Sequence, residues 1–132
     1  GASAVVCLSG FRAPLDTMRH WARRYTSVLA DIEYPFLWAR QRLSLGDETN
    51  EPADEELISC GIPAFVGQGS NDETVEDEIS LLYHLLDENP KNVSFFMEED
   101  PNFNGHDNIL FNDGVANTVL LDKIDNFIQS VI

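Results

Sequence analysis

Two residues in the second half of the chain, Asp72 and His106, could act together in acid–base chemistry. Asp72 ends a glycine-rich turn after an apolar run at residues 62–66, and His106 lies in a polar loop after a second apolar run at residues 93–97. If both runs are parallel strands, both loops leave the same edge of the sheet, where open α/β sheets place their sites. An Asp that orients a His makes up two thirds of a Ser-His-Asp triad. The stretch lacks the nucleophile that would complete it.

Both residues also have structural interpretations. Asp72 could cap the next helix through an Asx turn, and His106 could be an exposed loop histidine. Asp77 is a second candidate for the acid, although it suits the negatively charged first turn of a helix. His84 and His106 have acids nearby, but their spacing matches no standard set of metal ligands. We therefore expect no metal and no other cofactor.

The hydrophobic pattern of the second half predicts the elements that position these residues. The runs at 62–66 and 93–97 are expected to be strands, with helices over about 75–88 and about 115–131. Sequential strands joined by a helix form a parallel pair in a right-handed crossover. The predicted fold class is therefore α/β, and two or three strands suggest the last units of a larger sheet.

The first half is less regular. Residues 4–8 are apolar and predict a strand or a buried segment, and apolar residues at helical spacing predict an amphipathic helix over about 16–30. Tyr34–Trp38 is aromatic and contains Pro35, so we expect irregular structure there. Residues 43–56 are acidic, with a glycine and a proline, and are expected to form a surface loop or linker.

Composition limits the classes of function. The chain has 132 residues, 43% of them apolar, which is enough for one domain with a core. Its net charge of −15 argues against nucleic acid or an anionic membrane surface as the main partner. The charge is uneven, because residues 1–42 carry a net charge of +3 and residues 43–132 carry −18. Cys7 and Cys60 could form one disulfide or remain free thiols.

Three motifs occur in an order that is similar to one protein family. Met18–Trp21 reads Met-Arg-His-Trp, Ile62-Pro63 and an apolar run precede Gly69-Ser70-Asn71-Asp72, and Asn104-Gly105-His106-Asp107 is followed by Ile109, Phe111 and Asp113. Together they resemble the cap helix, the acid turn and the histidine loop of the acid lipases, the gastric and lysosomal lipase family of α/β-hydrolases. The likeness covers roughly residues 5–132.

The resemblance implies that the chain is the C-terminal part of an α/β-hydrolase fold. Residues 1–56 would be a cap-like helical segment with an acidic linker, and residues 57–132 the C-terminal core units. Asp72 would be the triad acid and His106 the triad base. The family's nucleophile lies upstream in a Gly-x-Ser-x-Gly elbow, and the oxyanion hole lies near it. No such motif occurs here, and neither Ser9 nor Ser70 has small residues on both sides.

The implied function is therefore that of a C-terminal fragment or subunit of a lipase-like serine ester hydrolase. The serine would come from an upstream segment or a partner chain, the substrate would be a carboxylic ester of a lipid, and the lone chain would be inactive. A first alternative is a non-catalytic, hydrolase-derived interaction subunit of a larger assembly. A second is an unrelated small α/β domain whose Asp loop binds a ligand or a metal.

Two further expectations concern partners and compartment. A short sheet leaves an edge that natural proteins cover, so we expect a partner chain or a second copy. The family resemblance and the glycosylation tripeptide Asn92-Val93-Ser94 favour a secretory or lysosomal compartment.

Overall fold

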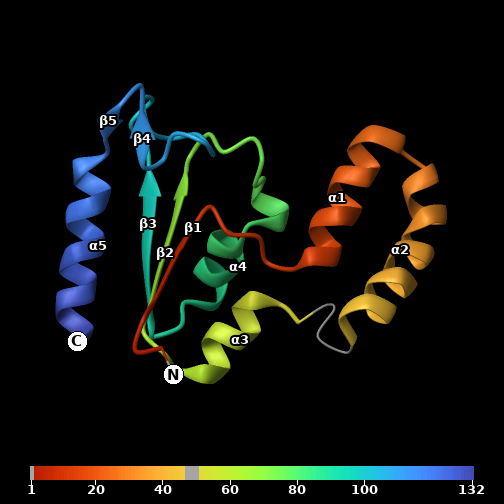
Figure 1. Ribbon diagram of the computed structural model, residues 1–132, viewed down its shortest axis with the longest axis horizontal. Helices are drawn as coiled ribbons and strands as arrows, with labels where there is room; N and C mark the ends of the chain where they lie inside the picture. The colour runs from red at the N-terminus through yellow and green to blue at the C-terminus, as the bar shows by residue number, and fades with distance from the viewer. Residues whose placement is uncertain (1, 47–50) are drawn as a thin grey trace.

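A parallel three-stranded sheet forms the centre of the computed structural model, which describes residues 2–46 and 51–132 (Figure 1). Strands β1 (Val5–Leu8), β2 (Ala64–Gly69) and β3 (Val93–Glu98) lie in the order β1-β2-β3. Both pairings are parallel, which confirms the prediction of a parallel α/β arrangement. The carboxyl ends of all three strands therefore meet at one edge of the sheet.

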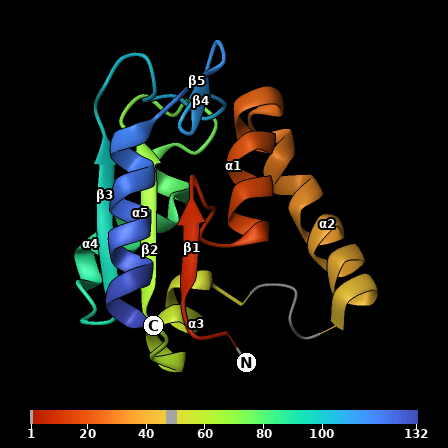
Figure 2. The same ribbon diagram turned by 60° about the vertical axis from the view of Figure 1, so that its left-hand side comes forward.

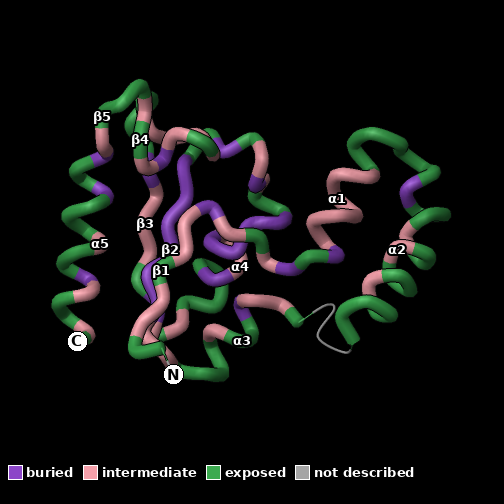
Figure 3. The backbone as a smooth tube through the Cα atoms, viewed as in Figure 1, coloured by how far each residue is buried: buried purple, intermediate pink, exposed green. Residues whose placement is uncertain are grey.

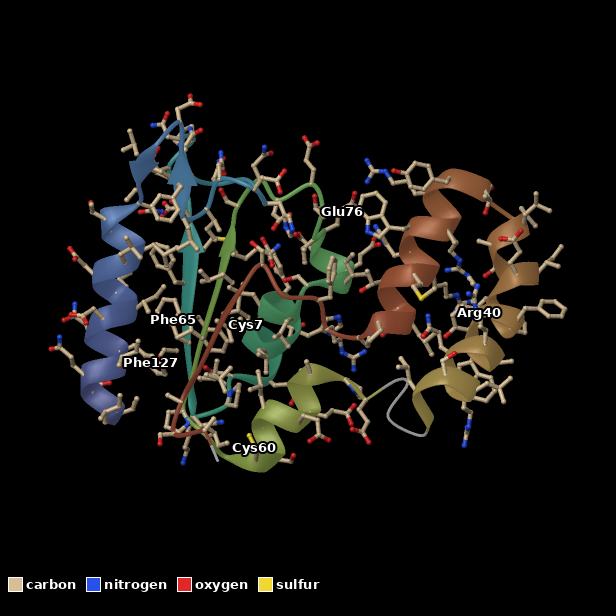
Figure 4. The ribbon with its side chains drawn as sticks, viewed as in Figure 1. Cys7, Arg40, Cys60, Phe65, Glu76 and Phe127 are labelled. Atoms are coloured by element: carbon tan, nitrogen blue, oxygen red, sulfur yellow. The ribbon has the colours of Figure 1, made fainter. Side chains whose placement is uncertain are left out.

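Helices cover both faces of the sheet (Figure 2). One face packs on α3 (Ala53–Cys60) and α4 (Leu81–Glu88), and the other packs on α5 (Thr118–Val131). Alternate residues of β2 supply the two cores, because successive side chains of a strand point to opposite faces. Ala64 and Val66 pack with the leucines of α4, whereas Phe65 packs against Phe127 of α5 at 5.8 Å between ring centroids (Figure 4). Every residue of β2 is buried.

Two long helices, α1 (Pro14–Thr26) and α2 (Leu29–Leu45), form a hairpin beside the sheet. Asp31 on α2 accepts hydrogen bonds from Arg19 and Arg23 of α1, at 3.2 and 2.7 Å, and these bonds lower the pKa of Asp31. Figure 3 shows that the buried residues are concentrated in β2 and α4, whereas the hairpin is largely half-buried or exposed. The hairpin is thus an appendage to the sheet core.

Several predicted boundaries are wrong. Tyr34–Trp38 is not irregular, because α2 continues through Pro35 to Leu45. The predicted loop at 43–56 contains the end of α2 and the start of α3, and its residues 47–50 lie outside the described residues. Helix α3 was not predicted, and the expected segment boundary after residue 56 falls inside it. Strand β1, from the expected first segment, pairs with β2.

The second half differs in detail. Gly67–Gly69 continues β2, so the turn begins only at Ser70. The predicted helix at 75–88 divides into the 3₁₀ turn η2 (Asp77–Ile79) and α4, because the Ser80 hydroxyl caps α4 by accepting the Tyr83 N–H. Strand β4 (Phe111–Asn112) pairs with β5 (Val115–Ala116), and α5 therefore starts three residues later than expected, at Thr118.

Both cysteines are free thiols (Figure 4). Cys7 lies on β1 beside the α3–α4 core, and burial raises the pKa of its thiol. Cys60 is exposed at the end of α3. The structure therefore has two free thiols and no disulfide between Cys7 and Cys60.

The nitrogen of the predicted glycosylation site has a structural role. The Asn92 side-chain amide donates hydrogen bonds to the carbonyls of Leu57 and Ile62, both at 2.9 Å. A glycan on this nitrogen would leave one N–H for two acceptors. Asn92 therefore serves in this fold as a link between α3, the entry to β2 and the entry to β3.

A buried polar pair links β3 to α5. The Asn117 amide donates to Glu98 at 2.6 Å and to the Ile109 carbonyl at 3.0 Å, and its oxygen caps α5 by accepting the Leu120 N–H at 3.1 Å. Glu98 and Asn117 are 6% and 3% exposed. Because a buried polar group without a partner is costly, each of these two residues needs the other.

We expect Asn117→Ala to lower the free energy of unfolding by about 2–4 kcal/mol, since it removes a helix cap and leaves buried acceptors unpaired. Urea unfolding followed by circular dichroism measures this. Asn102→Ala is the matched control, because the Asn102 side chain is exposed and should change stability by less than about 0.5 kcal/mol. Equal effects of the two substitutions would contradict this account of Asn117.

Candidate functional site

Asp72 and His106 meet at the carboxyl edge of the sheet. They follow β2 and β3, and the His106 Nδ1 lies 3.0 Å from the Asp72 Oδ2. The Asp72 side chain is fully buried, whereas that of His106 is 31% exposed. Because an ionised carboxylate can only accept, Nδ1 carries a proton, and in a neutral imidazole of this tautomer Nε2 has the lone pair. Within the described part of the chain, no group forms a hydrogen bond with Nε2.

The other oxygen of Asp72 organises its own turn. Oδ1 accepts the backbone N–H of Thr74 at 3.0 Å and that of Val75 at 2.8 Å. The Asx turn and the contact with His106 therefore coexist, one on each carboxylate oxygen. The turn caps no α-helix directly, because α4 begins only at Leu81. With both oxygens engaged, the carboxylate is fixed in position before any ligand arrives.

Gly69 allows the turn and the histidine loop to approach one another. The Asn71 N–H donates to the Asn104 carbonyl at 2.9 Å, and a Cβ on Gly69 would overlap that same carbonyl group. The Ser70 N–H donates to the Glu98 carbonyl at 2.8 Å and extends the β2–β3 pairing by one step. Gly69 is required here because the backbone of the neighbouring loop occupies the space of a side chain.

Internal hydrogen bonds also shape the histidine loop. The Asn108 side chain accepts the Gly105 N–H at 2.8 Å, directly before His106. At the start of the loop, the Glu98 carboxylate accepts the Asp100 N–H at 3.0 Å. Glu98 is also the partner of Asn117, so the loop and helix α5 share one anchor. The imidazole thus lies on a loop that is fixed at both ends.

Two open hollows flank the pair. One of about 310 Å³ lies against His106, and its lining is mostly polar: Asn71, Glu73, Thr74, Gly105, His106, Asp107 and Asn108. The other, of about 520 Å³, borders Asp72 and extends to Arg24 of α1. The hairpin therefore borders the same region as the acid–base pair.

Among the described contacts, none of the other candidate side chains forms a hydrogen bond with Asp72 or His106. Asp77 lies in η2, and the His84 ring bonds the Glu78 carbonyl at 3.2 Å. Ser70 is exposed and accepts a long hydrogen bond of 3.5 Å from the Asn104 amide. Among the described residues, no group of three or more His, Cys, Asp and Glu side chains could hold a metal ion.

Two features of this region carried no signal in the sequence. His20 of α1 lies 3.1 Å from Glu76 and 3.2 Å from Glu78, and Arg24 also pairs with Glu76 (Figure 4). This charged contact joins the hairpin to the segment that follows the Asp72 turn. The second feature is Ser9, which has a left-handed φ of 51° at the end of β1 and a buried hydroxyl without a hydrogen-bond partner among the described residues.

Comparisons of the chain with family models, with characterised proteins and with solved structures found no match. In residues 2–46 and 51–132, no helix combines the length and apolar character that a membrane crossing requires. Functional inference therefore starts from the geometry of the acid–base pair.

We expect Gly69→Ala to push the Asn104 backbone away and separate His106 from Asp72. It should lower the free energy of unfolding by about 1–3 kcal/mol, as overpacking does. It should also abolish the hydrogen-bonded Nδ1–H proton signal that we expect from His106 in NMR spectra of the unmodified chain.

Gly67→Ala is the matched control for this substitution. The one tight contact of its Cβ would be a methyl group of Leu8, at 3.0 Å, and that side chain can rotate. The Phe65 ring and the Phe96 carbonyl would lie at ordinary contact distances of 3.5 and 3.6 Å. It should leave the His106 signal in place. If Gly69→Ala also preserved the signal, the close approach at Gly69 would not control the geometry of the pair.

Proposed function

We propose that this chain supplies the acid and the base of a serine ester hydrolase with an α/β-hydrolase fold, whose nucleophile lies on an upstream segment or a partner chain. The observation that carries the proposal is the 3.0 Å contact between Asp72 and His106 at the carboxyl edge of adjacent parallel strands. The family resemblance of the motifs adds a substrate class, the carboxylic esters of lipids.

The order of the elements supports this proposal. In α/β-hydrolases the triad residues follow one another along the chain as Ser, then Asp or Glu, then His. Here the acid follows β2 and the base follows β3, and the α1–α2 hairpin is inserted between β1 and β2, where a cap would stand. An upstream segment with the nucleophile would precede β1 in such an order.

The edge of the sheet at β1 gives such a segment a place to bind. Among the described strands, β1 pairs only with β2, and its other edge has no strand partner. Val6, in the middle of β1, is 38% exposed. Strands that added at this edge would extend the sheet and bring their own carboxyl ends to the edge where Asp72 and His106 lie.

The chemistry follows from the proton positions. The His106 Nε2 would accept the proton of the serine hydroxyl as that oxygen attacks the ester carbonyl, and would then donate it to the departing alcohol. Asp72 would hold the Nδ1–H and stabilise the imidazolium between these two steps. Water, activated by the same Nε2, would then release the acid. The nucleophile must therefore lie within about 3 Å of Nε2 during the reaction.

The two serines that adjoin a glycine, Ser9 and Ser70, do not meet this requirement. The Ser9 hydroxyl is buried, and the Ser70 hydroxyl bonds the Asn104 amide. Neither forms a hydrogen bond with His106 among the described contacts. The proposal therefore includes the expectation that the isolated chain is inactive.

Fluorophosphonate labelling of the protein as purified from its source, read by mass spectrometry, tests the proposal. The probe reacts with activated serines. We expect it to label a serine of a Gly-x-Ser-x-Gly motif, either upstream in the same polypeptide or on a companion. Folded material that takes no label, or takes it on Ser9 or Ser70, would contradict the proposed division of the triad.

In the assembled hydrolase, Asp72→Asn and His106→Ala should each lower kcat/KM for a lipid ester by about 10³- to 10⁴-fold, because the base loses its orientation or is removed. His84→Ala is the matched control, since this histidine lies on α4 and bonds only a backbone carbonyl. It should retain nearly full activity. Activity that survived either change at the pair would rule out the catalytic assignment.

The unpaired edge of β1 also supports a second function, that of a non-catalytic interaction subunit. In that case a partner would cover β1 without supplying a serine. A stable complex that shows no labelled serine, and keeps its composition in Asp72→Asn, would favour this alternative over the hydrolase.

A further inference from the structure

The outer side of helix α2, the side that faces away from α1, carries an apolar stripe. Its members recur at intervals of three and four residues, so they share one side of the helix: Leu29, Ile32, Phe36, Ala39 and Leu43. The four large side chains are 58%, 62%, 75% and 89% exposed in chain order. The opposite side of α2 is covered, since Ala30 is buried and Tyr34, Leu37 and Gln41 are half-buried. One protomer thus leaves an apolar surface of α2 in water.

The stripe has the spacing of a short heptad repeat. Leu29, Phe36 and Leu43 occupy successive a positions, and Ile32 and Ala39 occupy d positions. Residues at e lie along one flank of such a stripe, and here they are Glu33 and Arg40. In a pair of packed helices, charges at this position face the partner and set its orientation.

The two flanking charges form no ion pair with any residue that the structure describes. Glu33 and Arg40, the latter labelled in Figure 4, are exposed, and neither forms an ion pair in the described part of the chain. They are separated by seven residues, about 10 Å along the axis, so they cannot pair with one another in one helix. The neighbouring Asp31 is bonded by two arginines of α1, so the hairpin does form ion pairs where its geometry allows.

We infer that the outer side of α2 binds the same surface of a second copy of this chain, with the two helices antiparallel. Flank e of one helix then faces flank e of the other, and Glu33 meets Arg40 of the partner subunit. The twofold symmetry forms the same ion pair a second time. A surface that is its own complement in this way suits a twofold dimer.

The antiparallel register also fits the sizes of the apolar side chains. When Glu33 faces Arg40 of the partner subunit, Ile32 lies opposite Phe36 of the partner subunit at the centre of the interface. Leu29 lies opposite Ala39 of the partner subunit in the next layer, a large residue against a small one. A parallel pair would instead place the e residues opposite Val28 and Pro35, which carry no charge.

The same register gives a role to the exposed turn of the hairpin. In this arrangement Leu43 lies near the partner's α1–α2 turn. Tyr25 and Val28 at that turn are 79% and 74% exposed in the single protomer. The interface would therefore extend along the whole length of α2 and end on these two side chains.

Sedimentation equilibrium of the 132-residue chain over a range of concentrations tests the inference. We expect a reversible dimer with twice the 14.8 kDa mass of the chain. Glu33→Arg or Arg40→Glu should each raise the dissociation constant about tenfold or more, because twofold symmetry turns two attractive pairs into two repulsive ones. The double variant E33R/R40E, which restores opposite charges across the interface, should return to within about threefold of the unmodified chain.

Lys91→Glu is the matched control for Arg40→Glu, because it changes the net charge by the same amount on an exposed residue outside the hairpin. It should leave the dissociation constant unchanged. Circular dichroism shows whether each variant keeps its helices, and the exposure of Glu33 and Arg40 makes loss of the fold unexpected.

A chain that stays monomeric, single reversals that do not weaken the dimer, or a double variant that does not recover would each overturn the inference. So would binding of the monomer to phosphatidylserine vesicles that Phe36→Glu abolishes, since a lipid surface would then be the occupant. Failure of the hydrolase proposal leaves these measurements unaffected, because they use neither Asp72 nor His106.

Discussion

The buried carboxylate of Asp72 is the constraint around which the carboxyl edge of the sheet is built. A charged group with no exposed surface needs strong hydrogen bonds in place of water. Asp72 receives three, two from backbone N–H groups of its own turn and one from the His106 ring. The turn therefore adopts one conformation, and that conformation fixes the direction in which the second oxygen points. The orientation of the His106 ring therefore follows from the hydrogen bonds that the buried Asp72 carboxylate needs in place of water.

Two buried polar residues, Gln68 and Glu98, carry this arrangement from the strands to the helices. Gln68, near the end of β2, donates to the Val75 carbonyl at 2.6 Å and accepts from the Ser80 hydroxyl that caps α4. Glu98, at the end of β3, holds the start of the histidine loop and the cap of α5. Strands β2 and β3 thus each carry, near the carboxyl end, a side chain that holds a loop of the candidate site and the cap of a helix. Because core and site share these residues, a change in one is expected to affect the other.

The sequence predicts those parts of the fold that depend on local pattern. The strands that become β2 and β3 are apolar runs, and parallel pairing follows from the helix between them, so the meeting of Asp72 and His106 could be expected. Gly67 and Gly69 predict a turn by their propensity, yet they lie in β2. At Gly69 the reason is tertiary, since the space of its side chain is filled by a loop that is remote in sequence. Local patterns contain no information about such an approach.

Other errors have local causes. Asp113-Gly114 is a favoured pair for a two-residue hairpin turn, and both residues have positive φ, 48° and 80°. The sequence thus contained the signal for β4–β5, but the long apolar pattern of the last helix obscured it. Pro35 predicts irregular structure by its propensity, but packing along α1 keeps α2 helical across it. The contacts of His20 and Arg24 with Glu76 could not be predicted, since they join segments more than 50 residues apart.

Helix α2 has an unusual distribution of apolar residues around its axis. An amphipathic helix on the surface of one domain has one apolar side, and the rest of it is polar. Helix α2 has apolar residues on the side that packs against α1 and again on the side that faces away from it. A helix of this kind gains stability when both apolar sides are buried, and the single protomer buries only the side that packs against α1. Because neither core of the sheet includes a residue of the hairpin, the outer side of α2 adds little to the stability of the fold. Its apolar stripe and its flanking charges are therefore better explained by association than by folding.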